Sequence, residues 1–123
     1  MTLRCVIVDD SPAVLRTGGD LLESQGIAVV GVATSGDEAV RLIEELQPDV
    51  LLVDIVLGAE SGSDLARRLA AAGSRIILIS TREEADFADL IAASSAIGFL
   101  PKSDLSAAAV HQLLAGPRDE ERY

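Results

Sequence analysis

Three aspartates in the sequence follow apolar runs, in a pattern that suits the binding of a cation. Asp9 and Asp10 come directly after the run Cys5–Val8, and Asp54 ends the segment DVLLVD. An apolar run of this kind predicts a strand that is buried on both faces. Adjacent carboxylates at the end of such a strand repel each other and resist burial. The pair therefore requires a compensating positive charge, which a metal cation or a basic partner surface would supply.

A hydroxyl and an ammonium group stand in equivalent places after two later apolar runs. Ser80 ends the segment IILIS, and Lys102 follows GFLP as the only lysine of a chain whose other basic residues are all arginine. A single lysine in such a chain indicates a need for a compact ammonium on a flexible stem. Each of these polar residues alone is ordinary, because Asp and Ser are common where strands stop. Their joint placement favours a functional site.

The positions of these residues depend on an alternation of apolar runs and segments with helical spacing. It predicts right-handed βαβ crossovers and a parallel sheet covered by helices on both faces. Ligands of such sheets bind beyond the carboxyl ends of the strands, so the three aspartates converge if the first and third strands are neighbours. The strands are expected at 5–8, 27–33, 50–53, 75–80 and 96–100, and the helices at 12–24, 36–47, 63–73, 82–95 and 103–116.

Composition narrows the class of protein. The 123 residues are 49% hydrophobic, which is enough for the core of one domain, expected over 1–116 with a polar tail at 117–123. A formal charge of −10 disfavours direct contact with nucleic acid or anionic lipid. The lone Cys5 is typical of a small buried side chain. No signal-peptide pattern or membrane-spanning run is present, so we expect a cytoplasmic, soluble domain.

In this order and spacing, the quoted motifs resemble the receiver domain of bacterial two-component response regulators over essentially the whole chain. The matching pieces are the DD pair, LLVDIVL, IILIS, GFLPKS, SGDEAV and Gly62. The segment GFLPKSDLSAAAVHQLLAG most resembles receivers that precede helix-turn-helix DNA-binding domains of transcription regulators. The resemblance implies an α/β, flavodoxin-like, doubly wound sheet of five parallel strands in the order 2-1-3-4-5, with five helices. Whether an output domain follows in the native protein is left open by the sequence.

The resemblance also implies roles for the polar residues. Asp54 is similar to the phosphoacceptor of the family, a carboxylate nucleophile that takes a phosphoryl group from a histidine kinase or a phosphotransfer protein. Asp9, Asp10, Asp54 and the backbone carbonyl of Val56 are the implied ligands of Mg²⁺, which prefers oxygen atoms. Lys102 would pair with the phosphoryl oxygens. The implied protein is a phosphoacceptor that takes part in its own chemistry, not an enzyme.

A switch is also implied by the resemblance. The Ser80 hydroxyl would donate a hydrogen bond to the phosphoryl group, and Phe99 is similar to the switch aromatic, although simple core packing is an equal interpretation. Phosphorylation would then change the surface of the segments 82–95, 96–100 and 103–116 and promote a homodimer. The expected apolar patch on that surface consists of Phe87, Ala107 and Ala108.

The sequence departs from the family pattern at several positions. Ser103 follows Lys102 where proline is frequent, which leaves open whether the Lys102–Ser103 peptide is cis or trans and makes Ser103 a candidate N-cap of the last helix. Gly58 replaces a frequent proline, which predicts a more flexible loop. Val56 and Arg82 are unable to activate an attacking water, so we expect slow self-dephosphorylation.

Other classes of protein are weighed against this one. A phosphorylation-independent interaction scaffold with a receiver fold typically loses an acid, the lysine or the hydroxyl, and this chain keeps them all. A phosphohydrolase with an aspartate nucleophile generally has a second acid where Val56 stands. A flavin- or nucleotide-binding relative needs a glycine-rich loop after the first strand, whereas this chain has DDSPAV.

Overall fold

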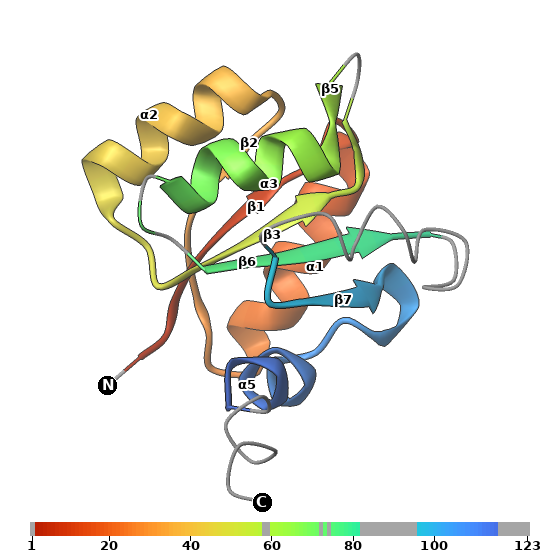
Figure 1. The fold of residues 1–123 in the computed structure, drawn as a ribbon. Helices are drawn as coiled ribbons and strands as arrows, with labels where there is room; N and C mark the ends of the chain where they lie inside the picture. The colour runs from red at the N-terminus through yellow and green to blue at the C-terminus, as the bar shows by residue number, and fades with distance from the viewer. Residues whose placement is uncertain (1, 58–59, 72, 74, 82–95, 116–123) are drawn as a thin grey trace, which may run out of the picture.

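The central feature of the structure is one five-stranded parallel sheet. A computed structural model describes residues 2–57, 60–71, 73, 75–81 and 96–115. The strand order is β2-β1-β3-β6-β7, which confirms the predicted order with β6 and β7 as its fourth and fifth strands (Figure 1). The strands are β1 (Arg4–Val8), β2 (Ala28–Ala33), β3 (Val50–Asp54), β6 (Arg75–Ser80) and β7 (Gly98–Pro101).

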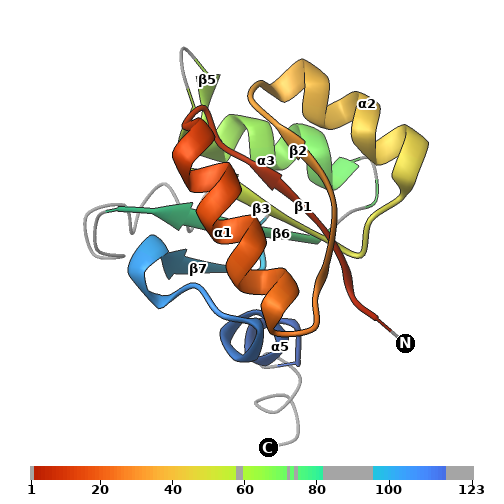
Figure 2. The same ribbon diagram turned by 180° about the vertical axis from the view of Figure 1, so that it is seen from behind.

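Helices cover both faces of this sheet, as the alternating pattern predicts. The helices α1 (Pro12–Ser24) and α5 (Ala107–Ala115) lie on one face, and α2 (Gly36–Leu46) and α3 (Gly62–Ala71) lie on the other (Figures 1 and 2). The helix expected at 82–95 lies outside the described residues. In the described part of the chain, no helix has the length and apolar character that a bilayer crossing requires.

Each face of the sheet has its own apolar core, because side chains alternate between the faces along a strand. On the α2 and α3 side, Val6 and Leu51 pack with Ile43 and Leu69. On the α1 and α5 side, the core includes Cys5, Ile7, Leu22, Leu52 and Val110. Strand β3 is buried along its whole length, so its terminal aspartate is set in a rigid, apolar frame.

The helix ends follow from local side chains. The Ser11 hydroxyl accepts a hydrogen bond from the Val14 amide at 3.4 Å, and Pro12 occupies the first turn, so α1 begins directly after the acidic pair. Gly26 and Gly73 have φ values of 96° and 100° just past α1 and α3, a left-handed conformation that is typical of the residue after a helix. The predicted stop at Gly116 lies outside the described residues.

The last helix begins later than the sequence predicts. A 3₁₀ helix, η2, spans Lys102–Asp104, and α5 starts only at Ala107. The Ser106 hydroxyl, and not that of Ser103, accepts the Ala109 amide at 3.0 Å. Leu105 between the two helices is extended and only 8% exposed, so its burial in the core interrupts the helix. No described peptide bond is cis, and that of Lys102–Ser103 is therefore trans.

Two smaller expectations also change. Ala107 is only 7% exposed and belongs to the core, so the predicted apolar patch with Ala108 is wrong for this residue; Phe87 lies outside the described residues. A two-stranded antiparallel sheet of β4 (Val56–Leu57) and β5 (Glu60–Ser61) follows β3 and was not predicted. Gly58, whose loop was expected to be flexible, also lies outside the described residues.

Candidate functional site

The acidic residues meet because β1 and β3 are neighbours in register. Val8 pairs with Val53, so Asp9 and Asp54 follow side by side at the carboxyl ends of the two strands. Asp10 is next along the chain, and one ligand oxygen of each of the three carboxylates lies within 4.8 Å of the other two. The convergence predicted from the sequence is therefore present.

The same register places the other two predicted residues at this edge of the sheet. Ser80 ends β6, is 4% exposed, and pairs with Pro101 of β7. Lys102 follows Pro101 directly, at the start of η2. Because the strands are parallel, the residues that follow neighbouring strands share one edge, and the polar side chains are held there by backbone pairing.

Burial differs strongly among the three carboxylates. Asp9 is 0% exposed and Asp54 is 8% exposed, whereas Asp10 is exposed to solvent. Buried carboxylates are unfavourable unless they are paired with a cation or hydrogen-bonded. The site therefore opens to solvent on the Asp10 side and has its most costly charge at Asp9.

Lys102 supplies the protein's own cation to this site. Its Nζ atom is 2.6 Å from Asp9 Oδ2 and 3.5 Å from Asp54 Oδ2. The longer contact has the geometry of a hydrogen bond, and the shorter one is an ion pair only. With its side chain 16% exposed, Lys102 contacts both buried aspartates at once. Counted over the described residues of the cluster, three carboxylates and one ammonium carry two net negative charges.

The donor set fits a divalent cation that prefers oxygen. Asp9 Oδ1 accepts the Ser11 amide at 2.9 Å, while Asp9 Oδ2 is buried and has no hydrogen-bond donor among the described residues. The Lys102 ammonium at 2.6 Å compensates part of this charge, and a coordinated divalent cation would compensate the remaining charge of the cluster. Asp10 and Asp54 offer further carboxylate oxygens beside it. These residues suit Mg²⁺, which takes one or two carboxylates and keeps several waters.

The remaining predicted residues lie close in the chain to this cluster or on the core side of β7. Val56 begins β4 two residues after Asp54, so its backbone carbonyl stays a predicted ligand. Phe99 is 7% exposed and is part of the core on the α2 and α3 face, in register with Leu78.

Cys5 belongs to the core on the α1 and α5 face, and burial raises the pKa of its thiol to about 12, so it is no nucleophile.

Two features of the site were missed at the level of the sequence. The close partner of Lys102 is Asp9, although the resemblance directs the lysine toward the phosphoryl group on Asp54. Ser11 both caps α1 and donates its amide to Asp9, and this Asx-turn fixes the Asp9 carboxylate. The D-x-S-P spacing is a turn signal that points to the second feature, whereas no local signal points to the first.

Fold and site together define a class of protein: a doubly wound α/β domain with clustered aspartates and a lysine at the carboxyl edge of its sheet. Comparison with protein families matches residues 5–114 to the response regulator receiver domain, and the chain belongs to this family.

Individual relatives support the assignment. Response regulator GacA of Pseudomonas aeruginosa is 29% identical over 94% of this chain, and transcriptional regulatory protein LiaR of Bacillus subtilis is 30% identical over 98%. The chain spans 57% and 58% of the lengths of these two relatives. Among solved structures, a two-component response regulator of the LuxR family from Aurantimonas sp. superimposes with a TM-score of 0.81, at 29% identity, covering 99% of both chains.

Proposed function

We propose that this receiver domain accepts a phosphoryl group on Asp54 in a Mg²⁺-dependent reaction. The observation that carries the proposal is the convergence of Asp9, Asp10 and Asp54 within 4.8 Å, with Lys102 in contact with two of them. A phosphorylation-independent scaffold has no need for a buried acidic cluster, which is costly to maintain. The donor is a histidine kinase or a phosphotransfer protein, the partners with which response regulators of this family interact.

The reacting residue in this proposal is Asp54. One of its carboxylate oxygens attacks phosphorus and forms a P–O bond, while the P–N bond of the donor phosphohistidine breaks and the imidazole keeps the electron pair. Position favours Asp54, because it combines 8% exposure with two acidic neighbours and the nearby ammonium of Lys102. Asp9 is fully buried and Asp10 is exposed to solvent, so neither combines these conditions.

The other residues stabilise the charge that arrives with the phosphoryl group. The Lys102 ammonium pairs with a phosphoryl oxygen, and the Ser80 hydroxyl donates a hydrogen bond to another. Asp9, Asp10, Asp54 and the Val56 carbonyl would hold Mg²⁺, which supplies the positive charge that lets a phosphate dianion enter an acidic site. Without these cations, the cluster would repel the donor.

The output of the reaction is a change of surface on the β7 and α5 side of the domain. Ser80 moves toward the phosphoryl group, and Phe99 on the adjacent strand β7 repacks within the core without leaving it. The changed surface controls transcription through an output domain or a partner, and it favours a homodimer. The domain itself makes no contact with nucleic acid or membrane, and it works in the cytoplasm.

The proposal is tested by labelling with acetyl phosphate and Mg²⁺, followed by intact mass measurement. The wild-type protein should gain one phosphoryl group, and Asp54→Asn should gain none. Glu44→Ala, which removes an exposed acid on α2, is the matched control and should label normally. Full labelling of Asp54→Asn would refute the assignment. Sedimentation with and without beryllofluoride then tests the homodimer, and a monomer in both states at high concentration contradicts it.

A further inference from the structure

Lys102 contacts two carboxylates at different distances. Its Nζ atom is 0.9 Å closer to Asp9 Oδ2, at 2.6 Å, than to Asp54 Oδ2, at 3.5 Å. The nearer oxygen is buried and has no hydrogen-bond donor among the described residues. The ammonium therefore provides the main compensation for the most deeply buried charge of the site, and it is only secondarily a partner of Asp54.

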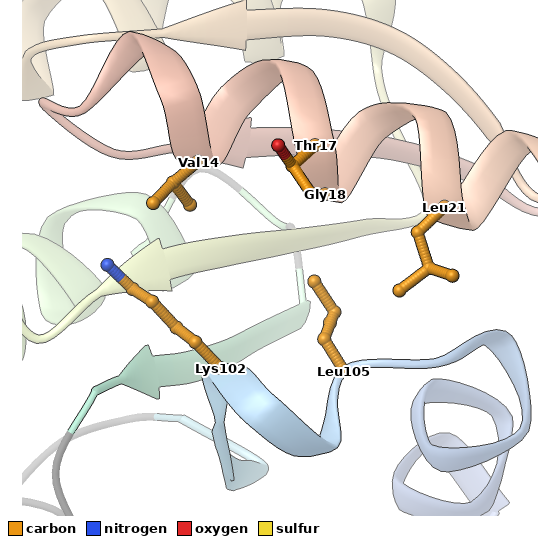
Figure 3. Close-up of a pocket in the computed structure, with 6 residues that line it drawn as sticks. All are labelled: Val14, Thr17, Gly18, Leu21, Lys102 and Leu105. Carbon is orange, nitrogen blue, oxygen red and sulfur yellow. The ribbon is translucent and has the colours of Figure 1, made fainter.

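The lysine stem has free space beside it. It lines a cavity of ≈ 200 Å³ together with Val14, Thr17, Gly18, Leu21 and Leu105. Figure 3 shows the stem starting beside Leu105 and its ammonium directed toward Val14, at the N-terminal end of α1. A side chain that borders an open cavity can change rotamer without displacing packed atoms. The stem therefore has room to change rotamer, which a shift of the ammonium from one carboxylate toward the other requires.

We propose that Lys102 is the built-in counter-ion of the metal-free site, and that it competes with Mg²⁺ for Asp9. The inference rests on the Mg²⁺ site of the proposed function. Two cations are unable to share Asp9 Oδ2 at contact distance, because their mutual repulsion in a poorly solvated site is large. When the metal takes Asp9, the ammonium leaves that oxygen, and Asp54 is the carboxylate it already contacts. Metal binding at Asp9 is then coupled to a shift of the Lys102 ammonium toward Asp54, the proposed phosphoacceptor.

Thermodynamic linkage makes the competition measurable. If Lys102 and Mg²⁺ compete for one oxygen, removal of the ammonium must raise metal affinity by the free energy of their coupling. Loss of a unit positive charge in contact with a buried ligand should tighten Mg²⁺ binding about tenfold or more. A lysine that merely orients Asp9 predicts the opposite, because its removal would loosen the ligand and weaken binding.

Calorimetric titration with Mg²⁺ distinguishes the two roles without any phosphodonor. Lys102→Met keeps the apolar stem and removes the charge, and Lys102→Arg keeps the charge. Arg68→Met is the matched control, because Arg68 also pairs with an aspartate, Asp37, at 3.1 Å, and neither residue belongs to the acidic cluster. Affinity should rise about tenfold in Lys102→Met, stay within about threefold of wild type in Lys102→Arg, and stay unchanged in Arg68→Met. Equal or weaker binding by Lys102→Met overturns the proposal.

A spectroscopic measurement follows the lysine itself. Because Lys102 is the only lysine, protein labelled with ¹³Cε-lysine gives a single resonance that needs no assignment. This resonance should shift during the Mg²⁺ titration with the midpoint found by calorimetry. It should stay in place in Asp10→Ala over the same range of concentration. A resonance that does not move while wild-type protein binds Mg²⁺ overturns the inference and leaves the proposed function intact.

These experiments give one result if the proposed function is wrong and another if only the competition between Lys102 and Mg²⁺ is wrong. If neither wild type nor Lys102→Met binds Mg²⁺, the metal site is refuted together with the inference built on it. Binding by Lys102→Met alone supports the competition in its strongest form. Acetyl phosphate labelling of Asp54 remains a separate readout of the phosphoacceptor.

Discussion

Gly18 of α1 lies directly against Leu105. A Cβ atom at Gly18 would be 3.4 Å from Leu105 Cδ2 and 3.9 Å from Ile7 Cδ1, which is close to van der Waals contact. Two adjacent glycines inside a helix are unfavourable by about 1 kcal/mol each relative to alanine. At Gly19, the nearest atom to a Cβ is Val29 Cγ1, at 4.0 Å, so both positions leave room for a methyl group.

Alanine substitution at either position should therefore raise stability. Gly19→Ala should raise the free energy of unfolding by about 0.5–1 kcal/mol, because helix propensity improves and nothing is displaced. Gly18→Ala should gain a similar amount, because its new methyl group makes an ordinary van der Waals contact with Leu105 Cδ2 at 3.4 Å. Urea denaturation of both variants measures the gains. A loss of stability in either variant would contradict the packing that the structure describes.

Removal of Asp10 should have opposite effects on Mg²⁺ affinity and on the stability of the metal-free protein. Asp10→Ala should lower Mg²⁺ affinity by about tenfold or more, because the site has few protein ligands. It should also raise stability in the absence of metal by about 0.5–1 kcal/mol, because one of three clustered charges is gone. Calorimetry and thermal melting with and without Mg²⁺ test both effects, with Glu44→Ala as the control. Lower metal-free stability of Asp10→Ala would argue against repulsion in the cluster.

Much of the fold and of the site was accessible from the sequence, because both depend on local patterns. Buried strands are apolar along their length, so Val50–Val53 and Arg75–Ser80 were located within one residue. The polar residues stand where those runs end, so Asp9, Asp54 and Ser80 were placed at one edge by the strand order alone. Parallel pairing aligns the residues that follow each strand, and this alignment brings the polar side chains together at the edge of the sheet.

What the sequence did not yield depends on contacts between distant residues. No local pattern around Leu105 indicates that its side chain is buried in the core, or that α5 begins only at Ala107. The pairing of Lys102 with Asp9 joins residues 93 positions apart, and it depends on the path of η2. The β4–β5 hairpin consists of two-residue strands, which are too short for any period to appear.

Cys5 should give the folded domain a distinct response to alkaline pH. Burial raises the pKa of its thiol from 9.0 to about 12. A raised acid pKa means that the unfolded chain releases the proton first, so the thiol's contribution is constant below pH 9 and falls between pH 9 and 12. Between pH 7 and pH 10, wild type should lose on the order of 1 kcal/mol more stability than Cys5→Ala. Urea denaturation at the two pH values measures this; parallel behaviour of both proteins would refute it.

Phe99 should be a strong contributor to stability. It is 7% exposed and packs in the core on the α2 and α3 face. Phe99→Ala should lower the free energy of unfolding by about 3–5 kcal/mol, whereas Phe99→Leu should cost less than about 1.5 kcal/mol. Chemical denaturation of the two variants provides the test. A cost below 1 kcal/mol for Phe99→Ala would mean that the ring is not packed as the structure has it.

The burial of Phe99 also makes a prediction about the switch. A switch aromatic that turns inward on activation starts from an exposed position, but here the ring is only 7% exposed and lies in the core. Activation should therefore change its solvent exposure little, and the change of surface should come mainly from Ser80, Lys102 and α5. Protein labelled with 4-fluorophenylalanine gives one ¹⁹F signal for each of its two phenylalanines, and Phe87→Leu assigns them. The solvent isotope shift of the Phe99 signal should stay small with and without beryllofluoride and Mg²⁺. A large shift in the free protein that disappears on activation would instead restore the inward-turning mechanism for this chain.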